Sequence, residues 1–271
     1  MTTPLTRQNN SRLSMGTAVL WLSVIVLLPL IALTTEAFSG GLSGFWEAVT
    51  SDGAVDALRV TVTVSLIVAV LNAVTGTLIA WVLVRDDFPG KRIVDAVIDL
   101  PFALPTIVAS LVLLSIYGPD SPIGITLNAT QPALVIALAF VTLPFVVRAV
   151  QPVLIELDKD VEEAAASLGA SNTTIFRRII LPALWPAALS GTGLAFARAI
   201  GEYGSVVLIG GNIPGDTQVA SQYIQEQIES DVPSAAAAVS IALLAITFIV
   251  LLALRLVGER ATSGKKKEQD A

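Results

Sequence analysis

Residues 60–84 read VTVTVSLIVAVLNAVTGTLIAWVLV, and none of them is charged. A helix needs about 20 mostly apolar residues to cross roughly 30 Å of hydrocarbon. Backbone groups in lipid must be hydrogen-bonded within the protein, which favours a helix. The stretch is rich in Val and Thr, but it is longer than an ordinary strand and has no alternating polar face, so a strand of a membrane barrel is not favoured. It therefore predicts a transmembrane helix.

Five further apolar segments flank this one, at residues 15–33, 100–117, 132–150, 185–209 and 235–254. The expected fold class is an all-α membrane protein of six spans, with a transmembrane domain at 15–254, an N-terminus at 1–14 and a tail at 255–271. Arg7 and Arg12 also suit a signal peptide. However, the apolar stretch after them exceeds a typical signal segment and no small-residue cleavage site follows it, so we expect a retained first helix.

The composition supports a membrane protein without chemistry of its own. Of the 271 residues, 54% are hydrophobic and 14% are charged, whereas soluble proteins carry about 25% charged residues. The chain has no Cys and no His. Their absence excludes disulfides, thiol nucleophiles, Cys/His zinc sites and Ser-His-Asp triads. We expect no catalysis and no bound cofactor in this chain alone, although a metal site of carboxylates stays open.

The basic residues predict the orientation, because Lys and Arg accumulate in cytoplasmic connections. Arg59 and Arg198 are the exceptions to an otherwise alternating distribution. Both termini are therefore expected in the cytoplasm, and the polar tail at 262–271 is expected to be disordered. The remaining Lys and Arg lie at Arg7, Arg12, Arg85, Lys91, Arg92, Arg148, Lys159, Arg177, Arg178, Arg255, Arg260 and 265–267.

The fourth connection, at 156–183, has the chemistry of two short helices. Asp160 and Glu163 suit a capping box at the start of the first helix, and Gly169 suits the C-terminal cap of the same helix. Ser171 suits the start of the second helix, which Pro182 is expected to end. These features alone are equally compatible with a hairpin that only packs on the membrane.

Seven residues of this connection match a known signature at its spacing. They resemble the EAA motif of ATP-binding-cassette importer permeases. The resemblance implies a six-helix type I importer permease whose coupling helices dock in a cleft of a separate ATPase, which binds the ATP. The matching residues, expected to couple to that ATPase, are Glu163, Ala164, Ala165, Gly169, Ile179, Leu181 and Pro182.

Other segments resemble the T-type subunit of bacterial sulfate/thiosulfate importers: LPFALPTIVA at 100–109, PFVVRAVQPVL at 144–154, FARAIGEYG at 196–204 and GNIPGDT at 211–217. This resemblance implies a W-type permease partner, two ATPase copies and an external sulfate-binding protein, in a bacterial cell membrane. Nucleic acid is not among the implied partners. Molybdate permeases share the last two pieces, so a molybdate or tungstate permease stays open, as does an ion-coupled carrier.

Arg198 and Glu202 stand four residues apart in the fifth predicted span, which places them on one helix face. Charges in a membrane usually face the protein interior or water. The pair either links helices or lines the path of an anion, and Arg198 could instead reach the interface. The resemblance places this segment at the gate, so Arg198, Glu202, Gly201 and Gly204 are candidate pathway residues.

The stretch GGNIPGDT at 210–217 has the spacing of a phosphate-binding loop. Asp216 occupies the position where such a loop needs a lysine, and no strand precedes it. We therefore expect no nucleotide there, but a turn on the outer face.

Overall fold

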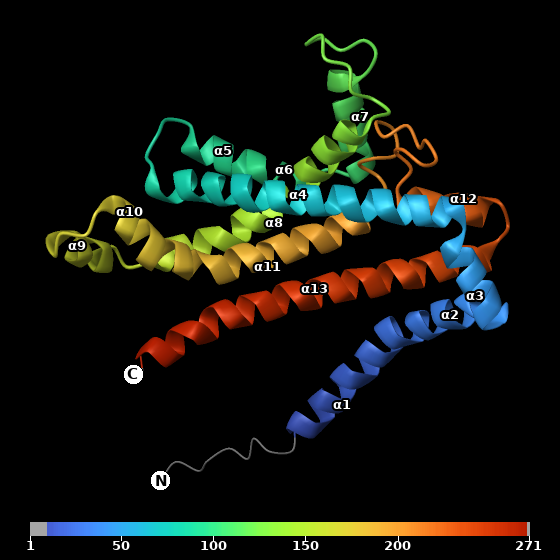
Figure 1. Cartoon of the computed structure of the whole chain (residues 1–271), viewed down its shortest axis with the longest axis horizontal. Coiled ribbons are helices and arrows are strands. Elements are labelled where there is room, and N and C mark those ends of the chain that lie inside the picture. Colours follow the sequence, from blue (N-terminus) through green and yellow to red (C-terminus); the bar gives the residue numbers. More distant parts are fainter. Residues whose placement is uncertain (1–9, 270–271) are drawn as a thin grey trace. The chain divides into compact units, whose positions relative to one another are not determined.

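The structure is a computed structural model that describes residues 10–269, with side chains for 14–258. The elements in this range are all helical (Figure 1). They are α1 (Asn10–Leu22), η1 (Ser23–Leu27), α2 (Leu28–Ala37), α3 (Gly41–Thr50), α4 (Asp52–Arg85), α5 (Lys91–Ile98), α6 (Leu100–Ala103), α7 (Thr106–Tyr117), α8 (Gln131–Glu156), α9 (Lys159–Ser167), α10 (Asn172–Ile175), η2 (Phe176–Ile180), α11 (Leu181–Ile200), α12 (Ala220–Glu229) and α13 (Pro233–Gln269).

The chain forms two compact units. The first comprises the residues up to Ser51 with Ile224–Ala242, and the second comprises Asp52–Tyr223 with the residues from Leu243 onward. Five helices across the described residues are long and apolar enough to cross a membrane. They are Ser14–Ala37, Asp52–Arg85, Gln131–Glu156, Asn172–Ile200 and Pro233–Gly258.

The third expected span is not one helix. It divides into α6 and α7, and α7 has 12 residues. Leu104 between them is extended, with φ −84° and ψ 134°. Pro105 causes the break, because a proline disfavours helical geometry in the residue before it and has no N–H to donate.

The fifth span also differs from the expected 185–209. Its helical run begins at Asn172 and ends at Ile200, and the next residue, Gly201, is the C-cap. Pro182 does not end a helix as expected. The π-helical turn η2 precedes it, and the Leu181 N–H bonds to the Phe176 carbonyl five residues back. This wider turn changes the hydrogen-bond partners just before the proline, so the helix continues. The same arrangement occurs at η1 before Pro29.

The expected disorder of 262–271 is wrong for the described part, because α13 continues to Gln269. Residues 270–271, like 1–9 of the expected N-terminus, lie outside the described residues. Lys, Glu and Gln are good helix formers, and extending a helix that already exists needs no new nucleus.

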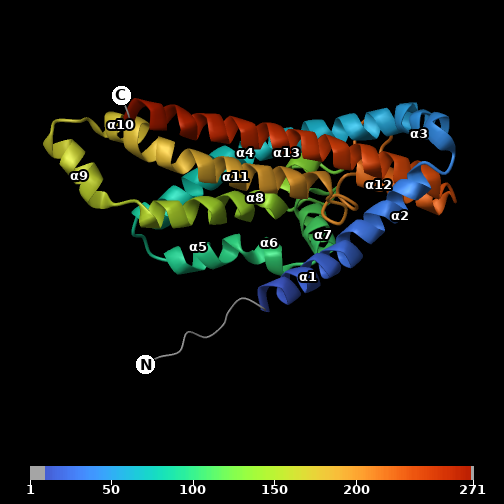
Figure 2. The ribbon, with the colours of Figure 1, turned by 90° about the horizontal axis from the view of Figure 1, so that it is seen from below.

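In the second unit, α4, α8 and α11 lie side by side (Figures 1 and 2). Glycines allow the close approach: a Cβ on Gly76 would lie 2.8 Å from the Val146 Cβ, and one on Gly191 would lie 2.8 Å from the Ala149 Cβ. Such small residues are typical of helix interfaces in membranes. Buried Asn72 donates to Thr142 Oγ1 at 2.9 Å, so α4 and α8 also share a polar link.

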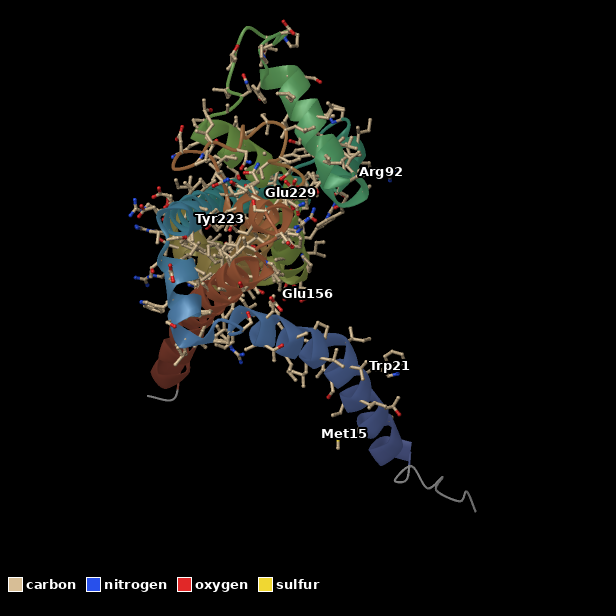
Figure 3. All side chains as sticks on the ribbon, turned by 90° about the vertical axis from the view of Figure 1, so that its right-hand side faces the viewer. Met15, Trp21, Arg92, Glu156, Tyr223 and Glu229 are labelled. Atoms are coloured by element: carbon tan, nitrogen blue, oxygen red, sulfur yellow. The ribbon has the colours of Figure 1, made fainter. Side chains whose placement is uncertain are left out.

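In the first unit, α1 and α2 present apolar side chains outward. Met15 and Trp21 project from α1 (Figure 3) and are mostly exposed. The local core is small and consists of Ala37, Ala237 and Ala238, with partly buried neighbours that include Phe45. An apolar helix of this kind suits lipid or another protein as its surroundings.

Candidate functional site: the 157–182 hairpin and the Arg198–Glu202 ion pair

The hairpin between α8 and α11 begins with a capped helix. Asp158, not Asp160, is the N-cap of α9, and its Oδ1 accepts from the Asp160 N–H at 2.9 Å. The expected capping box of Asp160 with Glu163 is therefore wrong, because α9 begins at Lys159 and both acids lie inside it. Asp160 and Glu162 fall in the first turn, where acidic side chains favour the positive end of the helix dipole.

The turn of the hairpin depends on Gly169. Its φ is +88°, in the left-handed region that glycine adopts without steric cost. The Gly169 N–H bonds to the Ala166 carbonyl at 2.9 Å, and the Ala170 N–H bonds to the Ala165 carbonyl at 3.0 Å. These two bonds form a Schellman motif, so the expected C-terminal cap is confirmed. The second cap is confirmed too, because Ser171 Oγ accepts from the Thr174 N–H at 3.3 Å.

The outer side of α9 combines an acid with apolar and small side chains. Glu163 and Ala164 are exposed, and Leu168 next to the turn is 90% exposed. Val161 is also exposed. Val161 and Leu168 thus add apolar surface to the side of α9 that carries Glu163 and Ala164.

The inner side of the hairpin holds it to the helices of the second unit. Ile175 and Ile180 are buried in a cluster with Leu83 and Leu154, and Ala165 and Ile179 pack against that cluster. Leu181 is 38% exposed and Pro182 is half-buried where α11 begins. The signature residues thus fall into an exposed group around Glu163, Ala164 and Gly169 and a group that anchors the hairpin.

An ion pair that the sequence did not indicate joins the hairpin to α4. Arg85 Nη2 donates to Glu162 Oε1, and these side chains are only 13% and 20% exposed. The Arg85 guanidinium carbon also lies 5.5 Å from the centre of the Trp81 ring, a cation–π contact. Trp81 in turn meets Phe176 edge-to-face at 5.8 Å. Arg85 and Glu162 lie 77 residues apart in the sequence, and no local pattern pairs them.

Arg198 and Glu202 form the expected pair, but not on one helix. Arg198 Nη1 lies 2.6 Å from Glu202 Oε2, while Glu202 follows the end of α11. The Glu202 side chain is 1% exposed and that of Arg198 is 39% exposed. Glu202 Oε1 accepts from the Ser205 N–H at 2.9 Å, and Ser221 Oγ donates to the Glu202 carbonyl at 2.7 Å. A fixed, buried carboxylate therefore holds a partly exposed guanidinium.

The segment after Glu202 packs closely on α7. A Cβ on Gly204 would lie 2.2 Å from Thr106 Oγ1 and 2.9 Å from the Ile107 nitrogen, so only glycine fits there. Ser110 Oγ accepts from the N–H groups of Leu208 and Ile209. Gly201 differs, because the nearest atom to its Cβ position is 4.0 Å away. Close packing therefore requires a residue without a Cβ at position 204, but it leaves room for a Cβ at position 201.

Residues 210–217 form the expected turn. Gly211 and Gly215 have φ of +80° and +78°. The Ile213 N–H bonds to Thr217 Oγ1, and the Ile213 carbonyl accepts from the N–H groups of Thr217 and Gln218. These bonds are internal to the turn, and Asp216 adds a negative charge to it.

A further ionic cluster links α5 to α8. Arg148 lies 2.8 Å from Asp95 and 2.6 Å from Asp99. The hydrogen bond from Arg148, and a second from Gln151, lower the pKa of the Asp95 carboxyl below its ordinary value. Arg148 belongs to the PFVVRAVQPVL segment, and its contacts fix the short α5 against the end of α8.

Comparison with known proteins gives a consistent result. Residues 72–263 match the family described as "Binding-protein-dependent transport system inner membrane component". The chain is 44% identical to the sulfate transport system permease protein CysT of Synechocystis sp., with 88% of this chain and 86% of that protein covered. It is 40% identical to the CysT protein of Escherichia coli, with 92% of each covered.

Among solved structures, the chain resembles a bacterial alginate ABC transporter in complex with an alginate pentasaccharide-bound periplasmic protein. The TM-score is 0.77 and the identity is 17%, over 93% of this chain and 94% of that one. This likeness shows the shared fold of type I importer permeases.

Proposed function

Because this chain belongs to the family of binding-protein-dependent transport system inner membrane components, we propose that it is the permease subunit of an ATP-driven importer of sulfate. The assignment of sulfate as the cargo rests on the 44% identity to a sulfate permease over most of both chains. The chain itself does not hydrolyse ATP, because in this family that reaction belongs to partner subunits.

Its partners are an ABC ATPase and an external binding protein. The family's description names the binding protein, and the similar solved structures are ABC transporters. The finer assignment is our own: a W-type permease as the second membrane subunit, two ATPase copies and a sulfate-binding protein. ATP and any other cofactor are held by the partners. The relatives and the resemblance of residues 144–154 support this composition.

The hairpin is the docking element for the ATPase. Its exposed Glu163 is available to a basic residue of the ATPase, and the small Ala164 with Gly169 permits close contact. Ala165, Ile179, Leu181 and Pro182 connect that surface to the membrane helices. ATP binding closes the ATPase dimer, the hairpin follows, and the helices alternate between outward and inward access.

Arg198 binds the anion transiently on its path, and Glu202 holds the Arg198 side chain in place. Gly201 and Gly204 shape the adjoining loop. The half-exposed guanidinium beside a buried carboxylate supports this role. A cation whose charge is partly balanced attracts sulfate without trapping it, as conduction requires.

Both termini lie in the cytoplasm, and the hairpin faces the same side. The end of α4, the end of α8 and the beginning of α11 lie at one end of the second unit (Figure 1). Arg85, Lys159, Arg177 and Arg178 belong to this end, which supports a cytoplasmic orientation by the positive-inside rule.

The test is reconstitution of the chain in liposomes with its ATPase, second permease and binding protein. We expect co-purification with the ATPase and ATP hydrolysis that rises with sulfate, together with sulfate uptake. Stimulation by molybdate and not by sulfate would overturn the cargo. Uptake driven by an ion gradient without ATPase would overturn the transporter class.

A further inference from the structure

We propose that the Arg85–Glu162 ion pair is the joint that transmits the movement of the docking hairpin to α4, and through α4 to the Arg198 gate. This inference rests on the proposed function. Both residues are positioning residues, since neither touches the anion or ATP.

The helix α9 has few other attachments. It has no buried residue, and Ala165 is its side chain that packs on the cluster around Leu83 and Leu154. The pair with Arg85 is the one ion pair that links α9 to a membrane-spanning helix within the described residues. Besides its chain connections to α8 and α10, α9 acts on the second unit through its pair with Arg85 and through the contact of Ala165.

Both arms of the hairpin connect to the last turns of α4. Glu162 on the first arm contacts Arg85, and Phe176 on the second contacts Trp81. Trp81 and Arg85 are one helical turn apart, and they contact each other. Two attachment points at one helix end allow the hairpin to shift and tilt α4 rather than slide past it.

α4 is suited to carry that movement along the unit. It has no proline between Asp52 and Arg85, whereas α8 contains Pro144 and Pro152 and α11 contains Pro186. Prolines kink helices and remove hydrogen bonds, so α4 is the stiffest of the three.

The half of α4 distant from Arg85 contacts the loop that holds the gate. Thr61 Oγ1 accepts from the Ala220 N–H at 2.7 Å. The next residue, Ser221, donates to the carbonyl of Glu202, which pairs with Arg198. Thr61 and Arg85 are separated by about 36 Å at 1.5 Å per residue. A continuous series of contacts thus connects Glu162 to Arg198.

The first experiment compares variants of the reconstituted complex. Arg85→Gln and Glu162→Gln should keep co-purification with the ATPase and keep ATP hydrolysis, but transport about 5-fold less sulfate per ATP or worse, which corresponds to a small coupling energy. The swap Arg85→Glu with Glu162→Arg should restore part of the ratio. Arg92→Gln is the matched control, since exposed Arg92 has no ion pair in the described structure and should leave the ratio unchanged.

The second measurement does not depend on the cargo. Because the chain has no cysteine, Tyr203→Cys gives a single thiol beside Glu202, at an exposed position. Its rate of labelling should change when the ATPase binds ATP, and this change should be lost with Glu162→Gln. The proposed role of the Arg85–Glu162 pair is overturned if the Glu162→Gln complex keeps the ATP-dependent change in labelling rate. It is also overturned if that complex keeps the wild-type ratio of sulfate transported to ATP hydrolysed. A wild-type complex that responds to ATP but carries another anion overturns only the assigned cargo.

Discussion

Gly169 shows how a single backbone angle can shape the surface that we propose for docking. Its left-handed φ of +88° closes the Schellman motif, and a Cβ built on it meets no atom within 4 Å. A side chain at this position therefore meets a conformational cost but no clash within the chain. It would project from the hairpin tip, next to exposed Leu168.

Three substitutions at Gly169 separate conformation from docking. Gly169→Ala should destabilise the hairpin turn by about 1 kcal/mol, and Gly169→Asn should be tolerated better because Asn adopts this region. Gly169→Trp should abolish capture of the ATPase and coupled uptake while the spans stay inserted. Co-purification and uptake measure both effects, and normal uptake with Trp would refute the docking role.

Arg198 and Glu202 are buried to different extents, so the contribution of the pair to stability can be tested apart from its contribution to transport. Loss of the arginine leaves a carboxylate that is 1% exposed without its counter-charge. Loss of the carboxylate leaves a cation that water can still reach. The first change is therefore expected to be the more damaging to the fold.

We expect Arg198→Ala to lower the free energy of unfolding by about 3 kcal/mol, and Glu202→Gln in the same chain to recover much of it. Sulfate uptake should stay low in that double variant, because the Arg198 guanidinium is absent although the fold is repaired. Thermal unfolding in detergent and uptake in liposomes give the two readings. Normal uptake in the double variant would reduce the pair to a structural role.

At the scale of elements, the break between α6 and α7 provides the surface on which the segment after Glu202 rests. Pro105 ends the first short helix, and Thr106 at the start of α7 then contacts Gly204. Ser110, one turn further, accepts from two backbone groups of the same segment. A continuous third helix would not present its first residues to this loop.

Gly204→Ala should therefore destabilise the protein by about 1–3 kcal/mol through overpacking against Thr106, and it should lower uptake. Gly201→Ala is the matched control, with 4.0 Å to the nearest atom. Gly201→Ala should change neither the stability of the protein nor sulfate uptake by much. Equal melting temperatures for the two variants would show that the contact with α7 is not needed.

At the scale of the whole molecule, the alternation of basic connections predicts which side each segment faces. The hairpin and the connection that contains Ile123 belong to opposite sides of the membrane in this scheme. Leu168 and Ile123 are both exposed, and the absence of cysteine allows one thiol to be introduced at a time.

Leu168→Cys should react with a membrane-impermeant thiol reagent in inside-out vesicles, and Ile123→Cys should react in right-side-out vesicles. The physical reason is that each thiol is exposed on one side of the bilayer, which the reagent cannot cross. Labelling of both residues from the same side would contradict the orientation. Mass spectrometry of the whole chain measures the fraction modified.

Local properties explain what the sequence alone could predict. The span at 60–84 follows from apolar length, and the left-handed turn at Gly169 follows from glycine. The docking role of the hairpin stays a prediction from the matched signature and its spacing. Each depends on residues that are neighbours in the chain. The errors at Asp160, Pro182 and the end of the fifth span are also local, and in each a neighbouring turn or cap changed the helix boundary.

The tertiary structure decided what depends on distant residues. It paired Arg85 with Glu162 across 77 positions, buried Glu202 while leaving Arg198 accessible, and placed Gly204 against Thr106. These contacts arise from the packing of α4, α7, α8 and α11. Helix propensity and hydrophobicity set where helices form, but only their packing determines which charges meet and which are removed from water.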